Sequence, residues 1–418
     1  MNDKKVVIDY LGCKLNQAEV EALTLDFIQA GYQPVSSREG AGIFVLNSCT
    51  VTHVADRKSR QWIRRIRREN PSALIVVTGC YAQRTPGKIK LIDENMIVLD
   101  NQQKMAMVQI LLERGYLKKD PLELAPALTT MQKTRSFVHI QHGCSNGCTY
   151  CIVPMVRSEC FSRTPSAIIR EIASRVLAGY TEIVLTGTEI GSYCSEGIQL
   201  QELVKMILDK TQIERLRLSS LQPRHLTEAM LDLWRDNRLC PHLHVSLQSG
   251  SDAVLKRMNR KYDRETYISI VEQIRRRIPD VAITTDVIVG FPGETPEEFE
   301  ETVDLCKKMG FARIHVFPYS PRPNTLALEM KPLVDEKEKK RREREMLSLA
   351  EESGRIFRQR FAGRVVPVLW ESCSNGLYSG LTPNYIRVYA SLNIPSINMI
   401  SRVKIGSIYR DGVKGEPV

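Results

Sequence analysis

The strongest constraint on the fold is a strand-then-helix alternation that recurs six times between residue 135 and about residue 330. Each run of β-branched and aliphatic residues predicts a strand, and an amphipathic helical stretch follows it. This pattern predicts parallel strands that form a barrel or partial barrel, with ligands at the carboxyl ends of the strands. The predicted strands are 137–141, 182–186, 215–221, 242–248, 282–289 and 313–318, and the helices between them include 167–177, 200–208, 228–235, 264–277 and 297–308.

The chain divides into three segments and one connection, and the predicted class is α/β. Residues 1–115 alternate strands and helices as a parallel α/β domain does, and residues 116–134 read as a polar linker. Residues 135–360 hold the βα units and end in a basic helix. Residues 361–418 carry short β-like runs separated by Gly, Asn and Pro, which predict a small five-stranded barrel.

Three cysteines stand directly after the first predicted barrel strand. Cys144, Cys148 and Cys151 lie in the run Gly-Cys-Ser-Asn-Gly-Cys-Thr-Tyr-Cys. Three thiolates on one short loop fit three irons of a cubane iron–sulfur cluster and leave the fourth iron open to a ligand. The alternatives are a structural zinc knuckle or unrelated buried thiols, and zinc would need a fourth Cys or His at matching distance. The spacing favours a redox cluster at which chemistry occurs.

A second set of cysteines follows the predicted strands of the N-terminal domain. Cys13, Cys49 and Cys80 come just after strands 6–10, 43–46 and 74–77. In a parallel sheet such loops converge on one crevice beyond the carboxyl ends of the strands. Gly12 and Gly79 would let the backbone approach a bulky ligand closely. The three are interpreted as ligands of a second cluster or, alternatively, as unrelated half-buried cysteines.

The other cysteines show no matching pattern and are interpreted as structural. The odd total of 11 Cys fits reduced thiols and metal ligation better than a disulfide framework. No run approaches the roughly 18 apolar residues of a membrane helix, and the first residues do not resemble a signal peptide. We therefore expect a cytoplasmic protein. The remaining five cysteines are Cys160, Cys194, Cys240, Cys306 and Cys373.

The net charge of +11 is concentrated in two basic blocks, residues 57–68 and 337–364. The second block interleaves Glu with Lys and Arg, which is also typical of a merely solvated helix. Together with the net charge the two blocks favour a polyanionic partner over two solvated faces. On a helix the first block places Arg57, Arg60, Arg64 and Arg68 on one face, and Ser59, Trp62, Ile63 and Ile66 on another face that would dock.

The loop that holds Cys144, Cys148 and Cys151 resembles that of the radical S-adenosylmethionine (radical SAM) superfamily, whose free iron binds SAM. With the N-terminal trio added, the whole chain resembles the methylthiotransferases of that superfamily, which carry a second 4Fe–4S cluster. The resemblance implies an N-terminal α/β domain, a radical SAM partial (β/α)6 barrel and a C-terminal RNA-binding barrel of the TRAM type. The cysteines that match the second cluster are Cys13, Cys49 and Cys80.

Runs around the N-terminal cysteines, 11–17, 47–52, 55–61 and 78–83, are similar to those of the threonylcarbamoyladenosine tRNA methylthiotransferases. Enzymes for isopentenyladenosine usually have Gln-Met after the first cysteine, and those for ribosomal protein S12 usually have Pro-Lys. The resemblance implies a tRNA substrate with a modified adenosine at position 37. The two sister substrates, and a non-catalytic RNA-binding iron–sulfur sensor, stay open as alternatives.

The C2–H of adenine is neither acidic nor electrophilic, so its functionalisation needs a one-electron route that cofactors supply. The resemblance implies that the cluster on Cys144, Cys148 and Cys151 cleaves SAM to form a 5′-deoxyadenosyl radical. It also implies that a second SAM methylates a sulfur carried on the other cluster. An external electron donor and a sulfur source are implied as partners, and a monomer is favoured.

Four further residues are candidates for cofactor binding. Gln248, Ser249 and Asp286 lie in runs similar to family core motifs, where they would bind SAM or orient the adenosine, or simply fill the barrel. Glu189 stands where Asn or His is more usual, and Gln222 replaces a frequent Glu. None of the departures from the family pattern removes a cluster ligand. The others are Ser158, Cys160, Asn324 and Leu326.

Overall fold

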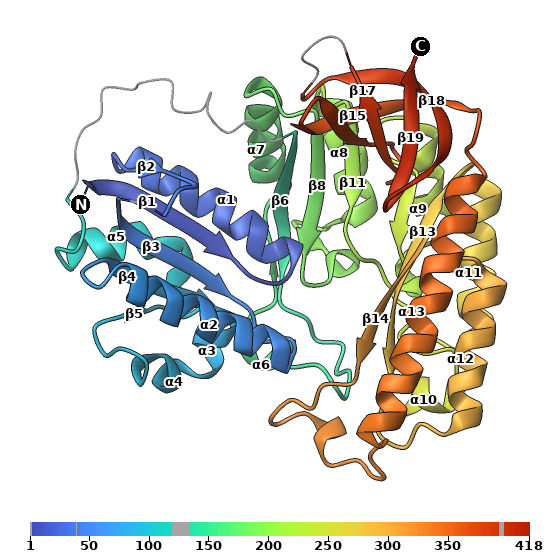
Figure 1. Cartoon of the computed structure of the whole chain (residues 1–418), viewed down its shortest axis with the longest axis horizontal. Helices are drawn as coiled ribbons and strands as arrows, with labels where there is room; N and C mark the ends of the chain where they lie inside the picture. The colour runs from blue at the N-terminus through green and yellow to red at the C-terminus, as the bar shows by residue number, and fades with distance from the viewer. Residues whose placement is uncertain (1, 39, 119–133, 393–396) are drawn as a thin grey trace.

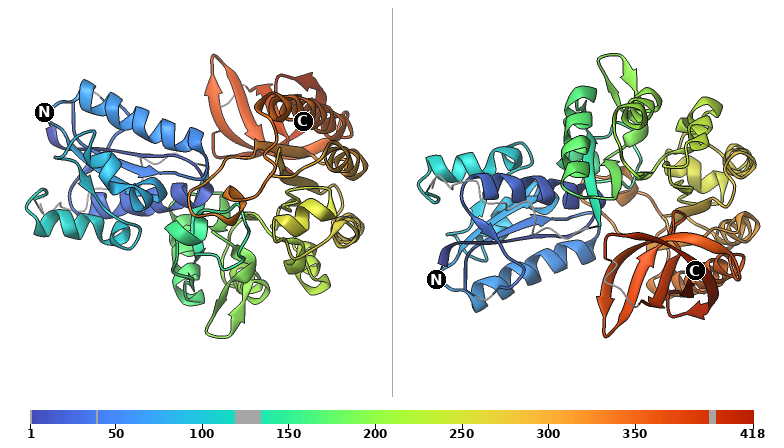
Figure 2. Two further views of the ribbon diagram at one scale, coloured as in Figure 1. Left: turned by 90° about the horizontal axis from the view of Figure 1, so that it is seen from below. Right: turned by 90° about the horizontal axis from the view of Figure 1, so that it is seen from above.

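The computed structural model of the chain describes residues 2–38, 40–118, 134–392 and 397–418. Most of the predicted linker, residues 119–133, therefore lies outside the described residues. The described part forms an N-terminal parallel sheet, a central open barrel and a small closed β-barrel (Figure 1). The predicted α/β fold class is confirmed, and Figure 2 shows the N-terminal sheet and the small barrel on separate sides of the centre.

The N-terminal sheet has the strand order β2-β1-β3-β4-β5, with all pairs parallel. Alternate residues of β3 point to opposite sides of the sheet, and the residues on both sides are apolar. Helices α1 and α5 cover one face, and α2, α3 and α4 cover the other. The strands are β1 Asn2–Tyr10, β2 Gln33–Pro34, β3 Ala41–Ser48, β4 Leu74–Gly79 and β5 Ile97–Val98; the helices are α1 Lys14–Gln29, α2 His53–Glu69, α3 Cys80–Arg84, α4 Pro86–Lys90 and α5 Met107–Glu113.

The central barrel contains the six predicted strands in sequence order. Two groups, β6-β8-β11 and β12-β13-β14, are joined by the parallel bridges Leu216–Leu239 and Leu221–Val245. Strands β11 and β12 are shorter than predicted, because beyond Leu218 and His244 the chain pairs only through isolated bridges. The strands are β6 Arg135–His142, β8 Glu182–Gly187, β11 Arg215–Leu218, β12 His242–His244, β13 Ala282–Val289 and β14 Arg313–Pro318, with β7 Phe161–Ser162 antiparallel at the edge.

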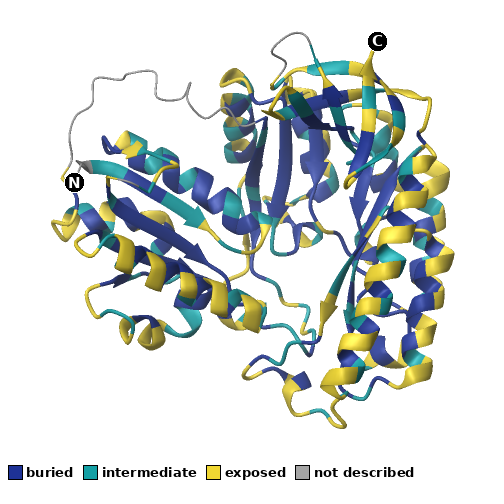
Figure 3. Cartoon of the chain, viewed as in Figure 1, coloured by how far each residue is buried: buried dark blue, intermediate teal, exposed yellow. Residues whose placement is uncertain are grey.

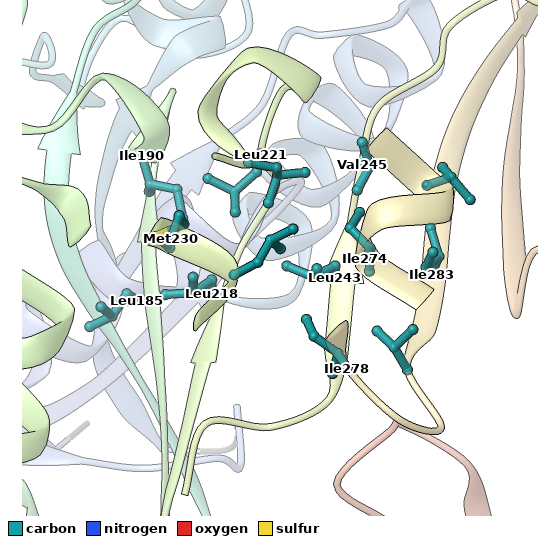
Figure 4. Packing of buried hydrophobic residues seen from close by; sticks show 14 of the residues in the cluster. Leu185, Ile190, Leu218, Leu221, Met230, Leu243, Val245, Ile274, Ile278 and Ile283 are labelled. Carbon is teal, nitrogen blue, oxygen red and sulfur yellow. The ribbon is translucent and has the colours of Figure 1, made fainter. Parts of the chain in front are cut away.

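Helices pack outside the barrel and bury its largest hydrophobic cluster. Leu185, Leu218, Leu243 and Ile283 come from four different strands and meet helix residues such as Ile274 (Figure 4). None of the helices that the structure describes is long and apolar enough to cross a membrane. The helices are α6 Val153–Val156, α7 Pro165–Leu177, α8 Leu200–Lys210, α9 Glu228–Leu231, α10 Asp252–Arg257, α11 Arg264–Arg277, α12 Pro296–Met309 and α13 Glu336–Gln359.

The C-terminal residues close into the predicted five-stranded barrel, in the order β15-β16-β17-β19-β18. Trp370, Val388 and Val403 are fully buried inside it. This small barrel packs against the amino ends of the core strands, at the end opposite the cysteine loops (Figure 1). The strands are β15 Val365–Ser374, β16 Leu377–Leu381, β17 Arg387–Ser391, β18 Ile400–Tyr409 and β19 Gly412–Pro417.

A buried ionic cluster holds the small barrel to the core. Glu182 accepts hydrogen bonds from Arg217 Nε at 2.8 Å and from Arg135 Nε at 2.5 Å. The Arg217 guanidinium stacks 4.0 Å from the centre of the Tyr385 ring and donates to the Thr382 carbonyl at 3.1 Å. Burial alone would raise the pKa of Glu182, but Arg217 and Arg135 lower it to about 2. The carboxylate is therefore ionised when it joins the two units.

We expect Glu182→Gln to lower the free energy of unfolding by about 3–5 kcal/mol, because buried guanidinium groups lose their shared carboxylate. Since the folded pKa of about 2 lies below the ordinary value of 4.5, the stabilisation is present above pH 4.5 and is lost as the pH falls toward 2. Chemical denaturation at pH 7 and across that range measures both effects. The control is Glu371→Gln, which removes a more exposed partner of Arg135 and should cost about 1 kcal/mol or less. Equal losses would contradict the assignment.

Candidate functional site

The N-terminal cysteines lie at one edge of the parallel sheet, as the pattern predicts. Cys13 is the N-cap of α1, Cys49 follows β3, and Cys80 is the first residue of α3. Cys49 and Cys80 are buried, whereas Cys13 is exposed. Burial raises the pKa of the Cys49 thiol to about 12, and the nearby Cys80 and Cys13 contribute to this increase. The three thiols are thus close enough to interact electrostatically.

Two glycines allow these loops to approach one another. Gly12 has a φ of 96°, and a Cβ placed on it would lie 2.5 Å from Cys49 Sγ. Gly79 has a φ of 91°, and a Cβ there would lie 2.4 Å from Asn47 Oδ1. Asn16 joins two of the loops by donating to the Leu11 carbonyl at 2.7 Å and to the Ser48 carbonyl at 3.2 Å. A side chain at either glycine would push the cysteine loops apart.

The second trio lies on the loop after β6. Cys144, Cys148 and Cys151 are half-buried, and burial raises the pKa of Cys151 to about 12. Arg260 Nη1 donates to Cys148 Sγ at 3.3 Å. The loop needs Gly143, since a Cβ there would lie 2.0 Å from the Glu159 carbonyl oxygen.

The donor set of both trios fits iron–sulfur clusters. Each trio supplies three free thiols on closely packed loops, and a cubane cluster takes each thiolate on a separate iron. A mononuclear site differs, because all ligands converge on one ion about 2.3 Å from each sulfur. No group of three or more His, Cys, Asp or Glu side chains within the described ranges is arranged to hold one metal ion.

A cavity of about 220 Å³ lies where the N-terminal domain meets the core barrel. The N-terminal domain contributes Val51 and Thr52, which directly follow the Cys49 loop. The core contributes Cys151 and the predicted site residues Gln248 and Asp286. Residues of both units therefore line the cavity, and of the six predicted cluster cysteines Cys151 is among them. The other lining residues are Tyr150, Ile152, Val153, Ile288, Phe317, Pro318, Tyr319 and Ser320.

Of the predicted core residues, Gln248 and Asp286 face this cavity and Ser249 does not. Gln248 has a φ of 68°, and its backbone N–H donates to the Asp286 carbonyl at 2.8 Å. Asp286 Oδ2 lies 3.1 Å from His244 Nε2. The Ser249 hydroxyl is fully buried, 3.2 Å from Thr302 Oγ1 on α12. Ser249 thus anchors the loop to α12 in this arrangement.

Glu189 lies beside the loop of the core trio and is bound on several sides. It accepts hydrogen bonds from Asn146 Nδ2 at 2.9 Å and from Gln222 Nε2 at 2.5 Å. His225 Nε2 lies 3.2 Å from its other oxygen. Its charge raises the pKa of Cys144, an effect added to that of burial. Two of the departures from the family pattern, Glu189 and Gln222, are therefore direct partners.

Two core arginines dock the N-terminal domain, and the motif analysis assigned neither of them. Arg157 follows α6 and donates to Glu19 Oε1 at 2.7 Å and to Asn16 Oδ1 at 2.9 Å. Lys104 Nζ donates to the same Glu19 carboxylate at 2.7 Å. Burial would raise the pKa of Glu19, but Lys104 and Arg157 hold it well below its usual range. This ion cluster lies directly beside Cys13, whose thiol contacts Asn16.

Arg322, after β14, makes the second contact. Its Nη2 donates to Asp56 Oδ2 at 2.7 Å and to Thr50 Oγ1 at 3.3 Å, although it is only 1% exposed. Arg84 Nη2 also donates to Asp56 Oδ2, at 2.6 Å. Because Thr50 follows Cys49, this arginine fixes the loop of one trio against the barrel that carries the other.

The comparisons with known proteins define the class first. A family model described as the radical SAM superfamily matches residues 138–306, and one described as uncharacterized protein family UPF0004 matches residues 5–100. The fold is similar to the radical S-adenosylmethionine methyltransferase TsrM of Kitasatospora setae, solved with cobalamin and a [4Fe–4S] cluster bound. The TM-score is 0.56 at 13% identity, over 90% of this chain and 80% of that chain. The core therefore has a radical SAM fold.

Sequence relatives narrow the class. The chain is 37% identical to the threonylcarbamoyladenosine tRNA methylthiotransferase MtaB of Bacillus subtilis, over 97% of this chain and 95% of the relative. It is 33% identical to the tRNA-2-methylthio-N(6)-dimethylallyladenosine synthase of Endomicrobium trichonymphae, over 97% and 99%. The chain belongs to the radical SAM methylthiotransferase family, as its cysteine pattern predicts.

We expect Arg157→Met to lower the free energy of unfolding by about 3 kcal/mol, because Glu19 loses a buried partner. Limited proteolysis should then cleave the N-terminal domain faster, since its docking contact is lost. Chemical denaturation and a protease time course measure the two effects. Arg65→Met is the control, because Arg65 forms an exposed pair with Glu69 on α2 and should cost about 0.5 kcal/mol or less. Equal effects of the two variants would contradict the docking role.

Proposed function

We propose that this enzyme adds a methylthio group to C2 of N6-threonylcarbamoyladenosine at position 37 of tRNA. The observation that carries the proposal is the cavity bounded by the Cys49 loop on one side and by Cys151 on the other. A base inserted there would contact Cys151 of one trio and Val51 and Thr52, which follow Cys49 of the other trio. The 37% identity to the Bacillus subtilis threonylcarbamoyladenosine enzyme supports the choice of substrate.

The proposed cofactors are two 4Fe–4S clusters and S-adenosyl-L-methionine. When bound, they supply the one-electron chemistry that the C2–H bond of adenine requires. We assign the SAM-binding cluster to Cys144, Cys148 and Cys151, and the sulfur-carrying cluster to Cys13, Cys49 and Cys80. Within this scheme Arg260 donates a hydrogen bond to the Cys148 ligand, at 3.3 Å from Sγ.

Other residues around the cavity have proposed roles in binding SAM, orienting the adenine and limiting water. Glu189 presents a carboxylate beside the Cys144 loop, which suits the amino group of a bound SAM. Gln248 and Asp286 supply an amide and a carboxylate on the cavity wall, where they would orient SAM or the adenine. Tyr150 and Phe317 add apolar surface that limits water around the reacting base.

The proposed functional units follow the predicted division. Residues 1–115 form the methylthiotransferase domain, 116–134 the linker, 135–360 the radical SAM core and 361–418 a TRAM-like RNA-binding barrel. We further propose that the enzyme acts as a monomer, in the cytoplasm with its tRNA substrate. Electrons and sulfur would come from external donors.

The two basic blocks differ in how their charges are used. On α2 the outward residues Arg57, Arg64 and Arg68 are exposed, and no ion pair joins them to any residue in the described ranges (Figure 3). Helix α2 begins at His53, next to the cavity wall. Its exposed arginines therefore lie at increasing distance from the cavity along the helix. On α13, by contrast, Arg341 pairs with both Glu338 and Glu345. We therefore assign the phosphate contacts near the anticodon to α2.

Loss of a cysteine from one trio should cause a different defect from loss of a cysteine from the other. We expect Cys144→Ala to abolish the reductive cleavage of SAM, because it removes a ligand of the SAM-binding cluster. Cys13→Ala should keep SAM cleavage and lose methylthiolation, because the radical is made without a sulfur to couple. Chromatography of 5′-deoxyadenosine and mass spectrometry of tRNA nucleosides separate the two outcomes. The same nucleosides from cells with and without the gene test the substrate, since dimethylallyladenosine would be modified instead if the sister reaction were correct.

The α2 assignment is tested by the salt dependence of tRNA binding. Replacing Arg57, Arg64 and Arg68 by Gln should lower the slope of log K against log[salt] by about 2, because each lost phosphate contact removes about 0.7–0.9. A variant with Lys337, Lys340 and Arg344 of α13 replaced by Gln has the same change in net charge and serves as the control. Its slope should change by less than about 1 if only long-range charge is lost. A larger change of slope in the α13 variant than in the α2 variant would assign the phosphate contacts to α13 instead.

A further inference from the structure

Lys14 is the first residue of α1, the helix of the N-terminal domain that packs against core strands β6 and β8. Ala18, one turn later, packs against Phe137 and Val184 of the barrel strands. Glu21, another turn on, accepts a hydrogen bond from the backbone N–H of Phe137 at 3.0 Å. Residues spaced four and three apart share one face of a helix, so Lys14 lies on the face that meets the barrel. It is half-buried there.

The surroundings of Lys14 leave its charge without a partner. Its ammonium interacts electrostatically with Arg217 and Arg135, and also with Asp286 and Glu182, across the barrel. Asp286 already has His244 at 3.1 Å, and Glu182 already has Arg217 at 2.8 Å. No hydrogen bond or ion pair joins Lys14 to any residue that the structure describes. A partly desolvated cation without a partner is costly, so this position suits an incoming anion.

The other cations around the trios already have partners. Arg260 binds Cys148 Sγ at 3.3 Å, and Arg157 binds Glu19 at 2.7 Å. Arg322 binds Asp56 at 2.7 Å. Within the described ranges, Lys14 is the cation of this set that stays available for a ligand. Its neighbour in sequence is Cys13, which we assign to the sulfur-carrying cluster.

We propose that Lys14 binds the carboxylate of the threonyl group on the substrate adenosine. This inference rests on the proposed function and identifies the residue that recognises the N6 substituent of the adenosine. A threonylcarbamoyl group ends in an α-carboxylate and a hydroxyl, whereas a dimethylallyl group offers neither. An adenosine with an apolar substituent would leave the ammonium unpaired and desolvated, which disfavours it. Since Lys14 follows Cys13 directly, the same helix end positions both the substituent and the sulfur.

The test uses the holoenzyme and two tRNA anticodon stem-loops that differ only in the substituent. One carries N6-threonylcarbamoyladenosine, and the other carries its carboxamide, which keeps the shape and removes the charge. We expect Lys14→Gln to lower kcat/KM at least about tenfold on the carboxylate RNA and less than about twofold on the carboxamide RNA, because only the first loses a charge-assisted hydrogen bond. Lys14→Arg should restore most of the loss. Lys205→Gln, on the exposed face of α8, is the matched control and should change neither value.

Binding of both RNAs by fluorescence anisotropy gives a readout that does not depend on turnover. Lys14→Gln should weaken binding of the carboxylate RNA alone. Equal losses on the two RNAs, or none on either, would overturn the role of Lys14 while leaving the proposed function intact. A wild-type enzyme that modifies neither RNA would overturn the proposed function and this inference with it. Circular dichroism and iron content identify a variant that is misfolded, and Lys14→Arg then decides the question.

Discussion

The geometry of the site depends on two buried arginine–carboxylate contacts between the N-terminal domain and the core. Arg157 reaches Glu19 and Arg322 reaches Asp56, each at 2.7 Å. Apolar packing tolerates sliding, but a buried ion pair loses several kcal/mol when one partner is displaced, which fixes the register of the two surfaces. Both contacts lie beside cysteine loops. The charges therefore set the separation between two trios that belong to different units of the fold.

A different buried ionic cluster joins the opposite end of the core to the small barrel. There Glu182 joins Arg135 and Arg217, and the small barrel covers them with Tyr385. The core is thus covered by two other units: the N-terminal sheet lies beside β6, and the small barrel covers the amino ends of the core strands (Figure 1). The barrel strands remain free to carry polar groups inward, because neighbouring units, rather than the barrel alone, exclude the solvent. This division explains how one chain can bury so many charged side chains near its site.

Periodicity and residue type predicted much of this arrangement. The strands and the position of each cysteine after a strand follow from local patterns, as does the buried face of α2 with Trp62, Ile63 and Ile66. The docking contacts could not be predicted in this way, because Arg322 and Asp56 are distant in sequence and each looks like an ordinary surface charge. Strands β11 and β12 were predicted too long, since their apolar runs continue into loops that pair only through single bridges. Local propensity cannot show where a curved sheet stops pairing.

The pair formed by Glu189 and Gln222 limits how the sequence around the site can change during evolution. The family pattern that the sequence resembles has Asn or His at the first position and often Glu at the second. In this chain the carboxylate is instead at the first position, with 2.5 Å between Gln222 Nε2 and Glu189 Oε2. A single replacement from the usual pattern would place two carboxylates, or two neutral groups, against each other. Two carboxylates at this contact would repel each other, whereas two neutral groups can still form a hydrogen bond. An exchange of the two residues is therefore expected to pass through the neutral pair, with the carboxylate lost from one position before it is gained at the other.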